Sequence, residues 1–294
     1  RRQRQMCIRD RYNKADYIAE TLKSVLNQTY CDYEVIVVND SSTDNSLEVA
    51  SSFQDERIHI YTKENEGVSA ARNYGIMHAK YDYIAFLDAD DIWESDYLEC
   101  QKKLIGTYPD AGIYSTAFYS LEKGKRKLRN VLINEHIHFL VHDYFKESVM
   151  NGLSICWTSS LCLKKEVIKE IPMFRVGIKR GEDLDLWLRI ALNYDVAYLN
   201  LPKVFYRTGL SDSLTSDYSK NGEFPYYEWF NFTSESSYYR KYVILVVYIH
   251  AKNAFIHHDY DTCLAELWSV KTIAWRFKWA ERLLLLVISW IKSK

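Results

Sequence analysis

The sequence predicts an α/β protein: a Rossmann-like, mostly parallel sheet flanked by helices, followed by a helical C-terminal extension. Three observations predict this class. Short apolar runs rich in β-branched residues, such as residues 33–38 (YEVIVV), are typical of buried parallel strands. Amphipathic segments separate these runs, so strands and helices alternate. From Tyr238 onward the pattern is helical to the end of the chain.

The elements of the first half follow in order. Asp16 can cap a helix that carries Ile18, Leu22 and Val25 on one face. The strand at residues 33–38 leads through the turn NDSSTD into a second helix. A strand at residues 58–61, a helix that begins at Gly67 and a third buried strand at residues 83–87 complete the pattern. Ligands of such sheets bind beyond the carboxyl ends of the strands, so we search those ends for the site.

The second half is less regular. It predicts strands at residues 157–163, 197–199 and 204–206, and an amphipathic helix at residues 182–192. We therefore divide the chain into an α/β domain at residues 12–215, with halves at residues 12–110 and 111–215, and a helical region at residues 216–294.

Composition excludes several classes. The chain has 38 basic and 39 acidic side chains in 294 residues, without the basic excess typical of nucleic-acid-binding proteins. Its six cysteines lack zinc-binding spacing and are scattered, which favours a reducing, cytoplasmic setting. The most apolar run, residues 283–291, is shorter than a membrane-spanning helix.

An acidic cluster follows the strand at residues 83–87. Asp88 and Asp90 are two residues apart, so their carboxylates point to the same side of the chain and repel each other. Mg²⁺ or Mn²⁺ would relieve that repulsion, with phosphate oxygens completing its coordination. An isolated D-x-D is more often a solvated turn, but its place after a buried strand favours a site.

Three more positions have competing interpretations. Asp40, at the end of its strand, could accept a hydrogen bond from a base imide, or Asp40 or Ser42 could cap the next helix. Arg72, in the second turn of the helix after Gly67, could bind phosphate or simply lie on the surface. Glu182 and Asp183 begin a helix, where acids are common, yet one of them could act as a general base.

Four blocks together resemble the family 2 glycosyltransferases, which have the A-type glycosyltransferase fold: VIVVNDSSTDNS, KENEGVSAARNYGI, YIAFLDADDIW and RGEDLDLWLRIA. The blocks occur in the family's order and spacing, and the resemblance covers about residues 12–215. It implies that this domain is catalytic, with residues 12–110 as its nucleotide-binding half and residues 111–215 as its acceptor half. It implies an inverting, non-processive bacterial enzyme. Such an enzyme would move a sugar from a nucleotide diphosphate sugar, with UDP as the expected nucleotide, to a glycan or lipid-linked acceptor.

The resemblance also implies roles for individual residues. Asp40 matches the aspartate that contacts uracil, Arg72 the arginine near the diphosphate, and Asp88 the acid near the ribose. Asp90 matches the acid that binds Mn²⁺ or Mg²⁺, and Asp183 matches the catalytic base. Supporting positions are Glu182, Asn65, Gly67, Asp91 and Trp187, the last of which we expect to pack behind the base.

The sequence departs from the family in three places. Ser41 stands where the family usually has Gly, and Tyr206-Arg207-Thr208-Gly209 lacks a histidine that can reach the metal in many members. The family's first apolar strand is replaced by RRQRQMCIRDR, which resembles translated sequencing-adapter sequence. We therefore expect residues 1–11 to be foreign to the fold and unpaired with the sheet.

Alternatives to this function are a nucleotide-sugar-binding module without turnover, a processive polysaccharide synthase fragment, or a non-enzymatic scaffold. WRFKW at residues 275–279 lacks the glutamine of the synthases' Q-x-x-R-W motif. Residues 275–294 carry Trp, Lys and Arg around an apolar segment. They predict either a terminal helix packed on the protein or a peripheral anchor at the inner face of the cytoplasmic membrane.

Overall fold

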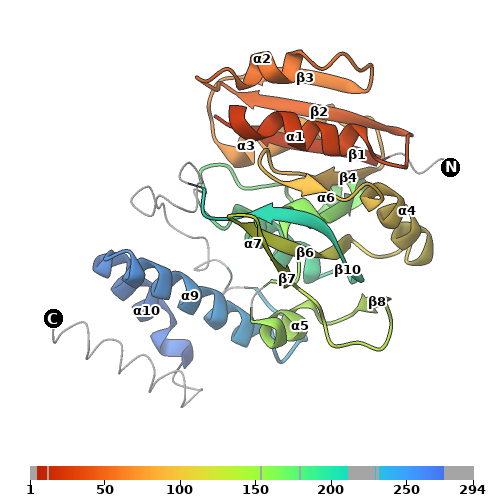
Figure 1. Ribbon diagram of the computed structural model, residues 1–294. Coiled ribbons are helices and arrows are strands. Elements are labelled where there is room, and N and C mark those ends of the chain that lie inside the picture. Colours follow the sequence, from red (N-terminus) through yellow and green to blue (C-terminus); the bar gives the residue numbers. More distant parts are fainter. Residues whose placement is uncertain are drawn as a thin grey trace.

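The computed structural model describes residues 5–11, 13–152, 154–178, 180–210, 229 and 232–274. Within them, ten strands form one sheet, and the C-terminal helices lie to one side of it (Figure 1). The strands are β1 (Gln5–Arg11), β2 (Tyr33–Asp40), β3 (Ile58–Lys63), β4 (Tyr83–Phe86), β5 (Ile92–Trp93), β6 (Ile113–Glu122), β7 (Lys125–Arg129), β8 (His138–Val141), β9 (Leu161–Lys164) and β10 (Val196–Arg207). Along the sheet the order is β3-β2-β1-β4-β9-β6-β10-β5, while β7 pairs with β6 and β8 with β10.

The sheet is parallel where the sequence predicts alternating strands and helices. β3, β2, β1 and β4 are parallel neighbours, and so are β6 and β10. β9 is antiparallel to both β4 and β6 and joins these two parallel groups. The predicted α/β class with the A-type glycosyltransferase fold is confirmed, and β5, β7, β8 and β9 add antiparallel pairing to its second half.

The prediction that residues 1–11 do not pair with the sheet is wrong for residues 5–11. β1 lies between β2 and β4, with Gln5 opposite Tyr33 and Tyr83. The prediction relied on side-chain composition, but strand pairing is a property of the backbone. Two buried parallel strands leave N–H and C=O groups that need partners, and any segment without proline can supply them. The polar composition of β1 did not prevent this pairing.

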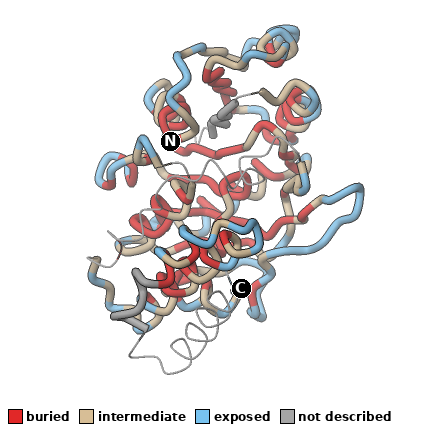
Figure 2. Tube along the Cα trace, turned by 90° about the vertical axis from the view of Figure 1, so that its left-hand side faces the viewer, coloured by how far each residue is buried: buried red, intermediate tan, exposed pale blue. Residues whose placement is uncertain are grey.

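Helices cover both faces of the sheet (Figure 1). They are α1 (Ala15–Leu26), α2 (Ser46–Ser51), α3 (Val68–His78), α4 (Tyr97–Thr107), α5 (Tyr144–Asn151), α6 (Lys165–Glu170), α7 (Glu182–Ala191), α9 (Tyr239–Ile256) and α10 (Tyr260–Ala274), with a 3₁₀ turn, η1 (Thr158–Ser160). β2 shows why both faces need cover: Val35 and Val37 join one apolar core, whereas Ile36 and Val38 join the other. Figure 2 shows the buried residues concentrated along the inner strands and the inward faces of the helices.

The predicted C-terminal helical extension is present as far as residue 274. α9 packs on α5, where Tyr242 is fully buried and its hydroxyl lies 3.0 Å from the hydroxyl of Tyr144. α10 packs in turn on α9. Among the described helices, none combines the length and apolar character needed to cross a bilayer. Residues 275–294, on which the anchor prediction rests, lie outside the described residues.

Candidate functional site

The acidic cluster lies directly beyond the carboxyl end of β4, as predicted. The chain turns there, with the N–H of Asp91 donating to the carbonyl of Asp88 at 3.1 Å. The side chains of Asp88 and Asp90 keep 29% and 17% of their surface exposed, whereas Asp91 is fully buried. Asp88 and Asp90 are therefore the two carboxylates of this turn that a ligand can reach.

Asp91 holds the turn in place through two hydrogen bonds. One of its carboxylate oxygens accepts a hydrogen bond from the Ser159 hydroxyl at 2.5 Å, and the other accepts from the backbone N–H of Arg207 at 3.0 Å. Burial raises the pKa of Asp91 well above its ordinary value, and the negative charges of Asp90 and Asp88 raise it further. Asp91 therefore fixes the turn to η1 and β10 and is not exposed to a ligand.

Arg72 connects the acidic turn to α7. Its guanidinium donates to Asp88 at 3.0 Å and to Glu182 at 2.8 Å, and its side chain is only 6% exposed. The ring of Phe174 lies 5.3 Å from the guanidinium carbon. The neighbouring Asn73 holds Phe174 in place through both its amide N–H and its carbonyl. Arg72 is thus a buried cation that bridges two predicted site regions and does not lie on the surface.

Glu182 and Asp183 begin α7 beside this bridge. Burial raises the pKa of Glu182, as does the charge of Asp183, while Arg72 opposes both effects. Asp183 accepts a hydrogen bond from the Thr158 hydroxyl at 3.1 Å and another from the N–H of Leu184. Glu182 thus forms an ion pair, whereas the donors to Asp183 among the described residues are neutral.

Asp40 lies at the carboxyl end of β2, away from the Arg72 bridge. It is buried, and it accepts hydrogen bonds from the backbone N–H groups of Glu66 and Gly67 and from the Lys63 ammonium. Asp40 does not cap the helix that follows it, α2, because the backbone N–H groups that donate to Asp40 lie just before α3. Gly67 has φ +89°, a conformation suited to glycine, and Asn65 is exposed.

Ser41 stands at a position where the family usually has glycine. Its φ is +56°, in the left-handed region where glycine is the usual residue. Its hydroxyl donates to the carbonyl of Lys63 at 2.7 Å, which ties the end of β2 to the end of β3. This hydrogen bond helps to hold the serine in a conformation that its side chain makes less favourable.

Two basic residues at the site were missed by sequence reasoning. The Lys14 ammonium, at the start of α1, lies 3.1 Å from a carboxylate oxygen of Asp90. Arg207 donates to the backbone carbonyl of Asp90 and to Glu20, and its guanidinium carbon lies 5.2 Å from the Tyr17 ring centroid. Arg207 stands in the Y-R-T-G segment that lacks the family's histidine. Both contacts depend on how distant elements meet, which no local pattern indicates.

The cluster suits a hard divalent cation. Asp88 and Asp90 offer carboxylate oxygens from one turn, and Asp90 already attracts the cation of Lys14. Mg²⁺ and Mn²⁺ need only one or two protein carboxylates when phosphate oxygens complete the coordination. Within the described ranges, no three Asp, Glu, His or Cys side chains converge on a possible metal position. The residues therefore fit a cation that is held jointly by protein and ligand.

Behind α7 lies a second polar network that the sequence did not reveal. Asp185 is fully buried and accepts hydrogen bonds from Arg189 at 2.9 Å and from the Trp229 indole at 2.9 Å. Arg189 also donates to backbone carbonyls at residues 172 and 173. Trp187, buried as predicted, packs against Phe86 and Phe174. Together these contacts fix the helix that carries Asp183.

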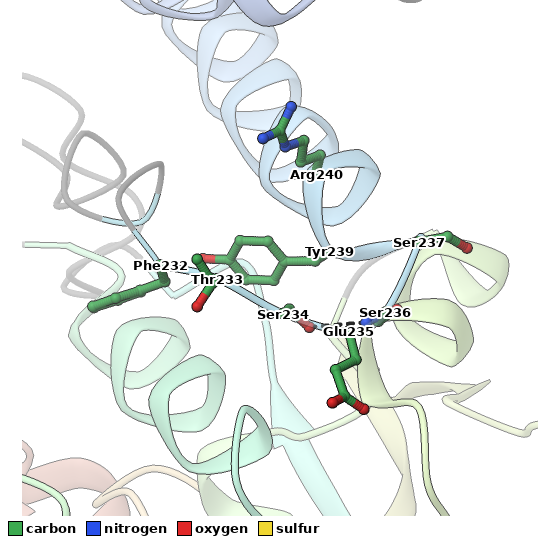
Figure 3. Close-up of a pocket in the computed structure, with 8 residues that line it drawn as sticks. All are labelled: Phe232, Thr233, Ser234, Glu235, Ser236, Ser237, Tyr239 and Arg240. Carbon is green, nitrogen blue, oxygen red and sulfur yellow. Dashed lines mark hydrogen bonds between the residues drawn. The ribbon is translucent and has the colours of Figure 1, made fainter.

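A pocket of about 300 Å³ lies at the start of α9, apart from the acidic turn (Figure 3). Residues 232–237, Tyr239 and Arg240 line it. Figure 3 shows the Glu235 and Arg240 side chains pointing in opposite directions, so the pocket has no paired charges at its centre. None of the predicted site residues lines this pocket, but the Tyr239 hydroxyl donates to the carbonyl of Trp229, which joins it to the Asp185 network.

Comparison with known proteins bears on the whole arrangement. The family described as "Glycosyl transferase family 2" matches residues 11–171. A teichuronic acid biosynthesis glycosyltransferase named TuaG, from Bacillus subtilis, is 32% identical over 190 residues, covering 64% of this chain and 71% of its own. Glycosyltransferase GlyA of Streptococcus pneumoniae is 32% identical over 206 residues, but these are 67% of this chain and only 29% of GlyA.

Solved structures share the fold. TarS 1–349 of S. aureus, in complex with UDP-GlcNAc, has a TM-score of 0.71 at 17% identity, over 90% of this chain and 80% of that one. A mannosyltransferase from Pyrobaculum calidifontis, in complex with GDP-Man and Mn²⁺, has a TM-score of 0.59 at 17% identity, over 97% of this chain and 80% of that one.

Proposed function

Because the chain belongs to glycosyl transferase family 2, we propose that it transfers one sugar from a nucleotide diphosphate sugar to an acceptor hydroxyl, with inversion. The observation that carries this proposal is the Arg72 bridge. Arg72 is 110 residues from Glu182 in sequence, yet it contacts both Glu182 and Asp88. The D-x-D turn and the acidic start of α7 therefore form a single cluster.

The donor occupies the carboxyl edge of β2, β1 and β4 in this proposal. Support comes from the related fold of TarS, which was solved with UDP and with UDP-GlcNAc. Asp40 holds the loop before α3 by two backbone hydrogen bonds, accepts a third from Lys63 at the end of β3, and so shapes the base-binding end of the site. A carboxylate has about four acceptor positions, so one remains for the N–H of a uracil base.

Asp88 and Asp90 would hold Mn²⁺ or Mg²⁺ against the donor diphosphate. The cation would offset the negative charge that grows on the leaving diphosphate. Arg72 adds a fixed positive charge next to Asp88 and keeps that carboxylate oriented. Lys14 lies at Asp90 and can move to a donor phosphate oxygen when Asp90 takes up the cation.

Asp183 acts as the general base. It takes the proton from the attacking acceptor hydroxyl, while the Thr158 hydroxyl and the N–H of Leu184 orient its carboxylate. Glu182 stays paired with Arg72 and does not compete for that proton. A single displacement at the anomeric carbon inverts its configuration and needs no covalent intermediate. The similarity to TuaG, a glycosyltransferase of teichuronic acid biosynthesis, leads us to propose a cell-envelope glycan as the acceptor.

The test is a screen of UDP-, dTDP- and GDP-sugars for metal-dependent donor hydrolysis and transfer. Asp183→Asn should reduce transfer by about 10²- to 10⁴-fold and leave UDP affinity nearly unchanged, because the base acts on the acceptor. The anomeric configuration of the product, read from its proton NMR couplings, reports inversion. Retention of configuration, or a loss of UDP affinity equal to the loss of rate, would contradict the proposal. Donor binding without turnover would favour a binding module.

A further inference from the structure

The hairpin formed by β6 and β7 carries a row of cations. All five residues of β7 are exposed, and four of them are basic. Lys125, Lys127 and Arg129 alternate along the strand, so they project from one face, with about 7 Å between neighbours. We call these three residues the cation row. It extends for about 14 Å along the edge of the sheet.

Within the described part of the chain, no carboxylate lies within ion-pair distance of the cation row. Arg129 donates to the Ser120 hydroxyl at 3.2 Å, which is a neutral partner. The other face of β7 is different: Arg126 stacks on Phe205, with 4.6 Å between its guanidinium carbon and the ring centroid, and Leu128 follows it. Across the strand pair Lys125 lies opposite Glu122, whereas Lys127 and Arg129 lie opposite Ser120 and Phe118. Among the described residues, Lys127 and Arg129 are therefore the members of the cation row that do not face a carboxylate across the strand pair.

That face leads toward the acidic cluster. Arg129 pairs with Phe118 and Lys127 with Ser120, and cross-strand partners share a face. Phe118 stacks on Trp157, with 5.4 Å between ring centroids, and Tyr206 lies 4.7 Å from Trp157. These three rings form an aromatic cluster at the inner end of the cation row.

The aromatic cluster borders the proposed base. Trp157 directly precedes Thr158, whose hydroxyl binds Asp183. Burial raises the pKa of Tyr206, and the nearby charges of Asp91, Asp88, Asp90 and Asp183 raise it further, which agrees with its place beside the acids. Trp157 and Tyr206 are half-buried and leave part of their surface accessible. Such rings suit the apolar face of a sugar.

We propose that the cation row and the aromatic cluster together bind an acceptor glycan that carries carboxylate or phosphate groups. Sugar rings stack at the aromatic cluster with a hydroxyl directed to Asp183, and the anionic groups of the chain lie along Lys125, Lys127 and Arg129. This inference rests on the proposed function for the role of Asp183, but the binding of an anionic glycan can be tested separately. The competing explanation is that lysines on an outer strand only prevent pairing with other chains.

The experiment compares a triple variant with a charge-matched control. Lys125→Gln, Lys127→Gln and Arg129→Gln together remove the cation row. Lys23→Gln, Lys146→Gln and Lys252→Gln remove the same charge from exposed positions on α1, α5 and α9. The probes are an oligogalacturonate, a short linear polyphosphate and a neutral maltooligosaccharide, each measured by calorimetry at low salt. UDP affinity is measured in parallel for all three proteins.

The triple variant should bind an anionic probe about tenfold more weakly than wild type, since three exposed contacts each contribute a fraction of 1 kcal/mol. The control should bind within about twofold of wild type, and UDP affinity should not change. Preference for oligogalacturonate indicates a uronate acceptor, and preference for polyphosphate indicates a phosphodiester acceptor. Lys127→Glu alone should weaken binding more than Lys127→Gln alone.

Several outcomes overturn the proposal: no binding of either anionic probe, equal binding of the neutral probe, or equal losses in the triple variant and the control. Binding only to phosphatidylglycerol vesicles would also overturn it and would assign the cation row to a membrane surface. Anionic-probe binding in an enzyme that never turns over a donor would leave this proposal standing and refute the proposed function. Turnover without binding of an anionic probe would refute this proposal and leave the proposed function standing.

Discussion

Replacing Arg72 by Met tests the bridge between the acidic turn and α7. The Met side chain keeps much of the stem volume but removes the charge that lies between Asp88 and Glu182. The side chains of Arg72 and Glu182 are 6% and 12% exposed, so Glu182 would be left as a nearly buried, unpaired carboxylate. Breaking a buried ion pair costs about 3–5 kcal/mol. Since Asp88 is 29% exposed and partly solvated, we expect the lower end, about 3 kcal/mol.

The loss should depend on pH in a definite direction. Burial and the charge of Asp183 already raise the pKa of Glu182 above 4.5 in the folded state, and only Arg72 and local hydrogen bonds oppose them. Without Arg72 the folded-state pKa rises further, so the folded protein binds a proton more readily than the unfolded chain. The penalty is therefore complete above the raised folded-state pKa and shrinks as the pH falls toward the ordinary value of glutamate.

Urea unfolding of wild type and Arg72→Met at about pH 7.5 and at about pH 5 measures this difference. The double variant Arg72→Met/Glu182→Gln should recover much of the stability at the higher pH, because it no longer contains the unpaired carboxylate. A loss of stability that is the same at both pH values, and that Glu182→Gln does not relieve, would refute the reasoning.

Three further predictions concern single positions. Asp90→Asn should lower turnover by about 10²-fold or more and shift the Mn²⁺ requirement to higher concentrations, while the melting temperature stays near that of wild type. Unchanged turnover of the wild-type enzyme in excess chelator would contradict this prediction. Asp185→Asn should lower the free energy of unfolding in urea by about 3 kcal/mol, because it leaves Arg189 with a neutral partner in a buried network. A loss below about 1 kcal/mol would show that this network contributes little to stability. Gly67→Ala should cost about 1–3 kcal/mol from its backbone conformation alone, because φ +89° with ψ 173° is a region that is essentially restricted to glycine, while a Cβ there meets no atom within 4 Å. An equally stable variant would show that the loop can change conformation.

The sequence predicted the fold where side-chain pattern and backbone pairing agree. The runs at residues 33–38, 58–61 and 83–87 became β2, β3 and β4, and the amphipathic segment at 182–192 became α7. The runs at 197–199 and 204–206 proved to be one strand, β10, with irregular pairing around Pro202. The prediction failed at β1, where composition alone was considered and the need of β2 and β4 for backbone partners was not.

The sequence could indicate candidate site residues only where their position at a strand end or a helix start is itself informative. Asp88, Asp90 and the Glu182–Asp183 pair could be selected as candidates because they follow a strand or begin a helix. The choice of Asp183 as the base came from the family resemblance and stays a prediction. Lys14 and Ser159 carry no such signal, since their roles arise where α1 and η1 meet the acidic turn. Asp185 lies one turn into α7, where a carboxylate usually faces water. It is buried here because Arg175, Arg189 and Trp229 contact it. Such contacts between distant elements are set by tertiary packing.

The sequence separation across the Arg72 bridge has a consequence for synthesis of the protein on the ribosome. β1 to β4 and the acidic turn are translated well before α7, because Arg72 and Glu182 are 110 residues apart. At roughly 5–20 residues per second, the delay is on the order of ten seconds. During that interval Arg72 can already pair with Asp88. The acidic turn therefore has a partner before Glu182 and Asp183 are made, and the cluster is complete only once α7 has been synthesised.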